Sequence, residues 1–276
     1  MEHVSIEISV SSEEESELLT AHLVGLGFTG FEEKPGQLLA FIPSENYHEH
    51  SVETLLAHMG RKFRKENIRE VNWNAQWESG FHPVEIFHPS NNLAFAYVRA
   101  TFHQPNPDFL HDLIIDPKMS FGTGHHATTH LMVQNMSEID LEGKRVIDFG
   151  TGTGLLAILA SKMGASEVLA IDCDDWSINN AKENFLLNSV GNVSLVKDDR
   201  FPKNHDADII LANINRNILL DNLAEMSRSV SKGGILLMSG IMPEDESIII
   251  SNISSENIGN ASVKRREAWS LIRIEN

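Results

Sequence analysis

Apolar and polar positions follow two different patterns along this chain. Up to about residue 70, strand-like stretches in which apolar and polar residues alternate are interspersed with two amphipathic helical stretches. From about residue 125, short apolar runs alternate regularly with helical patterns. The first pattern predicts a small α+β domain. The second predicts an α/β fold, in which helices cover both faces of a mostly parallel sheet.

The first part of the chain is predicted to contain four strands and two helices. The strands are expected at residues 4–10, 28–32, 38–42 and 63–71. One helix is expected to begin after Ser11-Ser12 and to end at Gly27, and the other is expected to follow Pro43-Ser44. The order strand–helix–strand–strand–helix–strand is that of a ferredoxin-like α+β domain.

The second part is predicted to form the parallel sheet. Its strands are expected at residues 145–149, 168–171, 193–197, 208–212 and 235–239, and its helices at 126–136, 155–163, 176–188 and 217–230. Further strands are expected at 84–87 and 93–100, and one or two antiparallel strands at 263–274. We therefore expect an α+β domain at residues 1–60, a connector at 61–80 and an α/β domain at 81–276.

The most specific motif follows the first of the buried parallel strands. Gly150, Gly152 and Gly154 stand at alternate positions, a helical pattern starts directly afterwards, and the next predicted strand ends in Asp172. Glycines allow a tight turn and a close approach of a ligand to the backbone. An acid at the end of the second strand can accept hydrogen bonds from the hydroxyls of a ribose. The motif therefore predicts a site for a cofactor that contains a nucleoside.

The glycine spacing favours one such cofactor. A dinucleotide-binding turn has the spacing Gly-x-Gly-x-x-Gly, which would require a glycine at the position of Leu155. The spacing here is Gly-x-Gly-x-Gly, preceded by Asp148, and it resembles the first motif of class I methyltransferases, which bind S-adenosylmethionine. A turn with a purely structural role would not explain acids at two adjacent strand ends, Asp148 and Asp172.

A second candidate region, residues 116–130, combines two glycines, several hydroxyl side chains and Phe121 in front of a predicted helix. Hydroxyls and free backbone N–H groups at a helix N-terminus suit a carboxylate, such as that of a methionine moiety. His126 and His130 lie four residues apart on this helix, but two histidines are too few ligands for a zinc site. No metal is therefore expected.

The predicted strand at 208–212 ends in Asn213-Ile214-Asn215. Methyltransferases that act on nitrogen often carry Asn or Asp at this place, followed by Pro-Pro and an aromatic residue. The side-chain carbonyl of Asn213 can accept a hydrogen bond from the attacking amine and direct its lone pair toward the methyl group. The missing Pro-Pro-aromatic argues against flat substrates such as adenine. The alternative is that Asn213 only caps the following loop.

Composition and charge narrow the function classes. The 276 residues include one cysteine, Cys173, no apolar run approaches the ~20 residues of a membrane span, and no signal-peptide pattern is visible. We therefore expect a cytoplasmic protein, and nothing requires more than a monomer. Of the net charge of −17, residues 1–60 carry −10, because they contain Lys34 and eleven glutamates. Such an acidic module repels nucleic acid and attracts a basic partner, or it is simply a soluble surface.

Nearly the whole chain resembles the family of ribosomal protein L11 methyltransferases, the PrmA type. The resemblance is carried by Asn72-Trp73 with Trp77, Asp116-Pro117, Phe121-Gly122-Thr123-Gly124 with Thr128-Thr129, Gly150-Thr151-Gly152-Thr153-Gly154, Asp172, Ala212-Asn213-Ile214, Gly233-Gly234 and Ser239-Gly240-Ile241. Among these motifs, the Phe-Gly-Thr-Gly loop with its two threonines is the most specific.

The resemblance implies a class I methyltransferase fold behind a small N-terminal domain that recognises the substrate. It implies trimethylation, from S-adenosylmethionine, of α-amino and lysine ε-amino groups of ribosomal protein L11. By motif position it implies cofactor contacts at Thr129, Gly150, Asp172 and Asn213. Asn213 is also the candidate catalytic residue, and the remaining candidate cofactor-binding residues are Phe121, Thr128, Asp148 and Gly152.

Three other functions are weighed against this one. A small-molecule N-methyltransferase would carry the same cofactor motifs but would not need an acidic N-terminal domain. A non-catalytic module that binds S-adenosylmethionine is disfavoured by Asn213 at the fourth strand. Methylation of RNA, or any direct contact with nucleic acid, is disfavoured by the net charge and by the lack of a basic face beyond residues 61–69.

Overall fold

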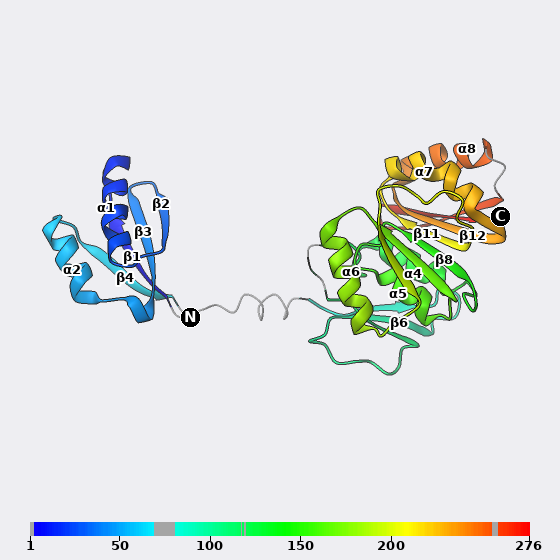
Figure 1. Cartoon of the computed structure of the whole chain (residues 1–276), viewed down its shortest axis with the longest axis horizontal. Coiled ribbons are helices and arrows are strands. Elements are labelled where there is room, and N and C mark those ends of the chain that lie inside the picture. The colour runs from blue at the N-terminus through cyan, green and yellow to red at the C-terminus, as the bar shows by residue number, and fades with distance from the viewer. Residues whose placement is uncertain (1–2, 69–80, 117, 119, 256–258) are drawn as a thin grey trace. The chain divides into compact units, whose positions relative to one another are not determined.

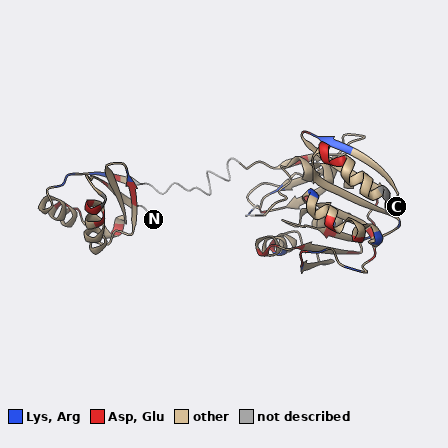
Figure 2. Cartoon of the chain, turned by 90° about the horizontal axis from the view of Figure 1, so that it is seen from above, with Lys and Arg blue, Asp and Glu red and all other residues tan. Residues whose placement is uncertain are grey.

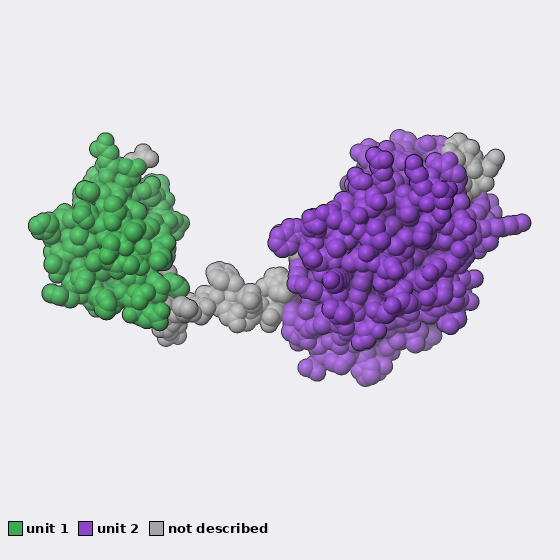
Figure 3. Space-filling model, viewed as in Figure 1, with its two compact units in different colours: residues 1–80 green, residues 81–276 purple. Residues whose placement is uncertain are grey.

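The computed structural model describes residues 3–68, 81–116, 118, 120–255 and 259–276. The chain divides into two compact units, Met1–Gly80 and Phe81–Asn276 (Figures 1 and 3). The motif Asn72-Trp73 with Trp77, which was expected in the connector, lies outside the described residues. Within the described part of the chain, no helix is long and apolar enough to cross a lipid bilayer.

The first unit is an antiparallel sheet with two helices. Its elements are β1 (His3–Ser9), α1 (Glu13–Gly25), β2 (Gly30–Lys34), β3 (Gln37–Pro43), the 3-10 turn η1 (Ser44–Asn46), α2 (Glu49–His58) and β4 (Phe63–Ile68). The strand order β2-β3-β1-β4 confirms the predicted ferredoxin-like arrangement. The range 1–60 that was predicted for this domain leaves out β4, although β4 pairs with β1 along its whole length.

Local sequence explains the start and the burial of α1. The hydroxyl of Ser12 accepts a hydrogen bond from the backbone N–H of Glu15, as expected of an N-cap. Leu19 and Leu23 lie one turn apart on the helix and are fully buried. They pack with Ile6 and Ile8 of β1 in the apolar core of this unit.

The second unit contains two sheets. The smaller sheet comprises β5 (Val84–Phe87), β6 (Ala94–Arg99) and β7 (His111–Ile114). The larger sheet and its helices comprise α4 (Ala127–Met136), β8 (Arg145–Phe149), α5 (Leu155–Lys162), β9 (Glu167–Asp172), α6 (Asp175–Leu187), β10 (Val193–Lys197), β11 (Ala207–Asn213), α7 (Arg216–Ser229), β12 (Val230–Ile241), η2 (Pro243–Asp245), α8 (Glu246–Ser255), β13 (Asn260–Arg266) and β14 (Trp269–Glu275).

The strand order of the larger sheet is β10-β9-β8-β11-β12-β14-β13. The first five strands in this order are parallel, and β14 runs antiparallel between β12 and β13. The predicted α/β fold with a mostly parallel sheet is thus confirmed. The order reverses between β8 and β11, and in such sheets the point of reversal is where ligands bind.

Helices cover both faces of this sheet (Figure 1). Val146 faces a core formed with α4, α5 and α6, whereas its neighbour Ile147 faces a core formed with α7 and α8. The strands β5, β8 and β10 begin and end at the predicted residues. β7 and α8 were not predicted.

Candidate active site

The candidate site lies at the carboxyl ends of three neighbouring parallel strands. β8 leads into the glycine loop, residues 150–154, while β9 ends at Asp172 and β11 ends at Asn213. Because parallel strands end at the same edge of a sheet, the three ends meet beside the point at which the strand order reverses. Residues from all three ends line one cavity of about 380 Å³.

The glycine loop requires glycine both for backbone conformation and for space. Gly150, Gly152 and Gly154 have φ angles of 79°, 55° and 84°, in the left-handed region that favours glycine. A Cβ atom on Gly150 would lie 2.1 Å from Cγ2 of Ile214, and one on Gly152 would lie 2.3 Å from the carbonyl oxygen of Phe121. The loop is therefore packed between two other loops of the site, and its backbone forms part of the cavity wall.

The carboxylate of Asp172 is held beside the glycine loop. Its Oδ2 accepts a hydrogen bond from the backbone N–H of Gly152 at 2.8 Å, and its Oδ1 accepts one from that of Asp174 at 3.0 Å. Asp174 in turn caps α6, because its side chain accepts a hydrogen bond from the N–H of Ser177. Asp172 is thus an oriented, partly exposed acceptor on the cavity wall, suited to the hydroxyls of a ribose.

Asn213 lines the cavity and carries an unpaired acceptor. Its Nδ2 donates to the hydroxyl of Thr129 at 3.3 Å, which fixes the orientation of the amide. Its Oδ1 is buried and has no hydrogen-bond partner among the described residues. A buried acceptor without a partner costs free energy, so such a group marks a place where a ligand is expected to donate.

Three rings form an aromatic wall on the cavity: Phe121, His126 and Trp269. The ring centroids of Phe121 and His126 are 5.1 Å apart, and those of His126 and Trp269 are 4.9 Å apart, both in edge-to-face geometry. Phe121 stays 53% exposed, so the wall has a free face. Trp269 reaches the cavity because β14 pairs with the end of β12, where Ser270 lies opposite Ile241.

Two histidines lie at the start of α4. The side chain of His126 caps the helix, with its Nδ1 3.3 Å from the backbone nitrogen and 2.7 Å from the hydroxyl of Thr128. One turn on, burial, together with the nearby Arg266, lowers the pKa of His130 to about 4. In the described part of the chain, no group of His, Cys, Asp or Glu is arranged to hold a metal ion.

The structure brings most of the predicted site residues together. Those that line the cavity are Phe121, Thr128, Gly150, Gly152, Asp172 and Asn213. Thr129 contributes through its hydrogen bond with Asn213. Asp148 is different, because it is completely buried and does not line the cavity.

Asp148 lies behind the glycine loop. Its Oδ2 accepts a hydrogen bond from the hydroxyl of Thr151 at 2.6 Å, while its Oδ1 has no partner among the described residues. Burial, with a smaller contribution from the negative charge of Asp172, raises the pKa of this carboxyl from 3.8 to about 7. Asp148 therefore supports the loop from inside the protein.

Several cavity residues were not recognised in the sequence. They are His126, which was considered only as a metal ligand, and Cys173, Ser177, Asp198, Asp199, Ile214, Asn215, Ile218, Gly240 and Trp269. Asp198 and Asp199 follow β10, so the strand-end argument that identified Asp172 would have identified them too. Trp269 gave no such signal, because its place depends on the pairing of β14 with β12.

Comparison with known proteins supports the family resemblance over nearly the whole chain. Residues 5–276 match the family described as ribosomal protein L11 methyltransferase (PrmA). A protein of Porphyromonas gingivalis with that name is 39% identical over 270 residues, which cover 94% of this chain and 90% of the relative. One of Phocaeicola vulgatus, also so named, is 35% identical over 258 residues, covering 90% and 89%.

A solved structure shares the fold. The crystal structure of a ribosomal protein L11 methylase from Lactobacillus delbrueckii subsp. bulgaricus superimposes with a TM-score of 0.63 at 28% identity. The superposition covers 71% of this chain and 99% of that one.

Proposed function

The chain belongs to the ribosomal protein L11 methyltransferase (PrmA) family, and we propose that it transfers methyl groups from S-adenosylmethionine to α-amino and lysine ε-amino groups of ribosomal protein L11. It is a methyltransferase with the class I fold, in which a parallel sheet carries the cofactor at its carboxyl edge. The match to protein-modifying relatives over both units favours this function over small-molecule N-methylation.

The residues of the cavity fit S-adenosylmethionine. Asp172 offers a carboxylate to the ribose hydroxyls, and the glycine loop offers backbone without side chains that would block the approach. At the other end, the N-terminus of α4 with Thr128 suits the carboxylate of the methionine moiety. Bound there, the cofactor supplies a methyl group on a positively charged sulfur.

The protein's own residues then prepare the amine. A lysine amine has a pKa of ~10.4 and an α-amine ~8, and each must be neutral to attack. Once a bound substrate covers the aromatic wall, water is excluded from the amine, and a poorly solvated site disfavours its protonated form. The Oδ1 of Asn213 accepts a hydrogen bond from the neutral amine and so turns its lone pair toward the methyl group.

The observation that carries this proposal is the unpaired Oδ1 of Asn213, a residue that lines the cavity beside the glycine loop and Asp172. The test is intact-mass spectrometry of unmethylated ribosomal protein L11 after incubation with this protein and S-adenosylmethionine. We expect mass gains in steps of one methyl group, and fragmentation would locate them on lysine and N-terminal amines. Binding of the cofactor without any gain in mass would move the search to other basic proteins or to small amines.

We propose that the acidic first unit docks the basic substrate. Its exposed glutamates, among them Glu14, Glu17 and Glu32, are drawn red in Figure 2. Three of its basic side chains are already paired within the unit, Lys34 with Glu32, Arg61 with Glu15 and Lys65 with Glu49. The net negative charge therefore remains available for a basic partner, which raises the rate of encounter. The protein is proposed to act as a cytoplasmic monomer without direct contact to nucleic acid.

A further inference from the structure

Three buried asparagines follow one another at intervals of four residues along one face of α6 and its C-cap: Asn180, Asn184 and the C-cap residue Asn188. None of them lines the cavity, and the proposed reaction does not use them. Their exposed fractions are 2%, 0% and 8%. Burial of an amide costs free energy unless its hydrogen bonds are made, so the hydrogen-bond partners of these asparagines indicate their structural role.

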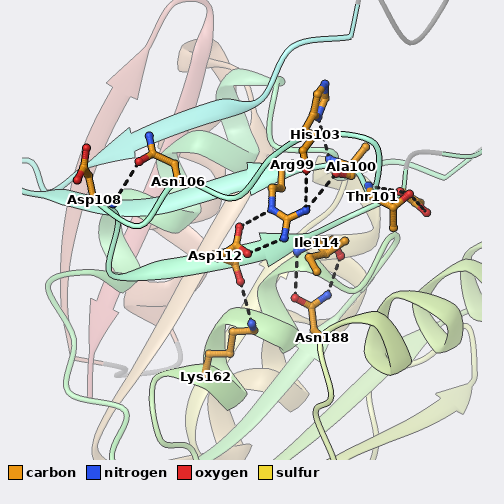
Figure 4. A network of polar contacts seen from close by, with 11 residues as sticks. Arg99, Ala100, Thr101, His103, Asn106, Asp108, Asp112, Ile114, Lys162 and Asn188 are labelled. Atoms are coloured by element: carbon orange, nitrogen blue, oxygen red, sulfur yellow. Dashed lines mark hydrogen bonds and ion pairs between the residues drawn. The ribbon is translucent and has the colours of Figure 1, made fainter. Parts of the chain in front are cut away.

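Asn188, the last of the three, is hydrogen-bonded to a strand of the smaller sheet. The Oδ1 of Asn188 accepts the N–H of Ile114 at 3.0 Å, and its Nδ2 donates to the carbonyl of the same residue at 2.6 Å (Figure 4). Ile114 ends β7, whose neighbour β6 is fixed by the ion pair between Arg99 and Asp112. Asn188 thus anchors the end of β7, a strand none of whose residues lines the cavity.

Asn184 instead joins two loops of the active site. Its Oδ1 accepts the backbone N–H of Asp116 at 3.1 Å, and its Nδ2 donates to the carbonyl of Thr153 at 2.8 Å. Asp116 precedes the segment that carries Phe121, and Thr153 belongs to the glycine loop. Asn180 adds a hydrogen bond from its Nδ2 to the carbonyl of Asp116 at 3.2 Å.

Thr153 continues this connection to the aromatic wall. Its backbone N–H donates to the carbonyl of Phe121 at 2.9 Å, and its hydroxyl donates to the carbonyl of Gly122 at 2.6 Å. The chain of contacts thus runs from Asn184 through Thr153 to Phe121. The same helix begins beside Asp172, because its cap, Asp174, donates its N–H to that carboxylate.

We infer that Asn184 is a positioning residue, which keeps the Phe121 side of the cavity in register with the glycine loop and Asp172. The inference rests on the proposed function, because its benefit is the alignment of amine and methyl group. Residues of α6 and its cap are hydrogen-bonded to both sides of the site. Supporting contacts of this kind maintain the geometry of the groups that bind and react. A misplacement of about 1 Å can cost about a hundredfold in rate.

The test compares Asn184→Ala with Asn188→Ala in the full chain. The two substitutions remove the same buried side chain from the same helix face. We expect both to lower the Tm, but only Asn184→Ala to lower kcat for L11 methylation, by about 10- to 100-fold. Thr153→Val, which removes a single hydroxyl, should lower kcat by about 3- to 10-fold and serves if Asn184→Ala does not fold. Equal kcat in Asn184→Ala and Asn188→Ala would overturn the inference.

Amide hydrogen exchange gives a readout that does not depend on activity. In the unsubstituted protein, S-adenosylhomocysteine should slow exchange both at residues 120–126 and at residues 150–154. In Asn184→Ala the slowing should persist at 150–154 and disappear at 120–126; slowing at both would overturn the inference. If the unsubstituted protein fails to methylate L11 but the exchange pattern holds, the proposed substrate is wrong while the positioning role stands.

Discussion

The two units of this protein differ in where they place polar side chains, at the surface or in the interior. In the first unit, the buried polar residues among those described are Ser5 and Ser16, and the carboxylates lie at the surface. The second unit buries a carboxyl, Asp148, and the row of asparagines on α6. Burial of a polar group lowers the free energy of unfolding unless its hydrogen bonds are made. The second unit accepts this cost at residues that hold the site in place, whereas the first unit carries surface charge that acts over longer distances. Substitutions in the second unit should therefore change cofactor binding or turnover, and those in the first should change association with the substrate.

The strongest test of this contrast is Asn213→Ala. We expect kcat to fall by about 100-fold or more, because the amine loses the acceptor that orients it. The affinity for S-adenosylmethionine, measured by calorimetry, should change by no more than several-fold. Asn192→Ala is the control, since Asn192 does not line the cavity and its side chain bonds Ser161 and the carbonyl of Ala165; its loss should cost about 1 kcal/mol of stability with little effect on kcat. Unchanged turnover in Asn213→Ala would remove this residue from the catalytic role.

Asp172→Ala should act on binding instead of on the chemical step. Loss of a charged acceptor for two hydroxyls should weaken the cofactor by about 10- to 100-fold, because hydrogen bonds to charged groups contribute ~1.5–3 kcal/mol. Calorimetry with S-adenosylhomocysteine measures this directly. The neighbouring Asp175 pairs with Lys197 on the surface, so Asp175→Ala should leave the affinity unchanged. Equal affinities in both variants would refute the ribose assignment.

The first unit is tested by reversing its charge. The triple substitution Glu14→Lys, Glu17→Lys, Glu32→Lys should raise KM for L11 by about tenfold and leave kcat unchanged, since only the encounter is affected. The KM of the unsubstituted protein should also rise with salt, and that of the variant much less.

An equal change of charge in the second unit is the control. The substitutions Glu142→Lys, Glu167→Lys and Glu244→Lys alter exposed positions there. They should raise KM for L11 by about twofold at most, because salt screens the attraction between exposed charges that lie more than about 10 Å apart. If both triple variants raise KM equally, net charge and not the first unit guides the substrate.

The parallel strands and the residues that support the site differ in how far the sequence predicts them. Buried parallel strands are continuous apolar runs, which is why β8 begins and ends where expected. The ends of two further parallel strands, β9 and β11, locate Asp172 and Asn213. β7 was missed because His111 and Asp112 give it no apolar run. The roles of Trp269 and of the α6 asparagines depend on which strands and loops meet in space, and periodicity carries no such information.

The last test of the contrast uses pH. The pKa of Asp148 is raised by burial from 3.8 to about 7, so between these values the folded protein binds a proton that the unfolded chain has released. The stability that this group contributes is fully present below about pH 4 and is lost as the pH rises through 7, by at most about 1.4 kcal/mol per pH unit. Urea unfolding of Asp148→Asn should lack this loss. No carboxyl is buried in the described part of the first unit, so the loss should be confined to unfolding of the second unit. A pH dependence of stability that is the same in Asp148→Asn as in the unsubstituted protein would show that Asp148 is ionised when buried, with its unpaired Oδ1 satisfied by a donor.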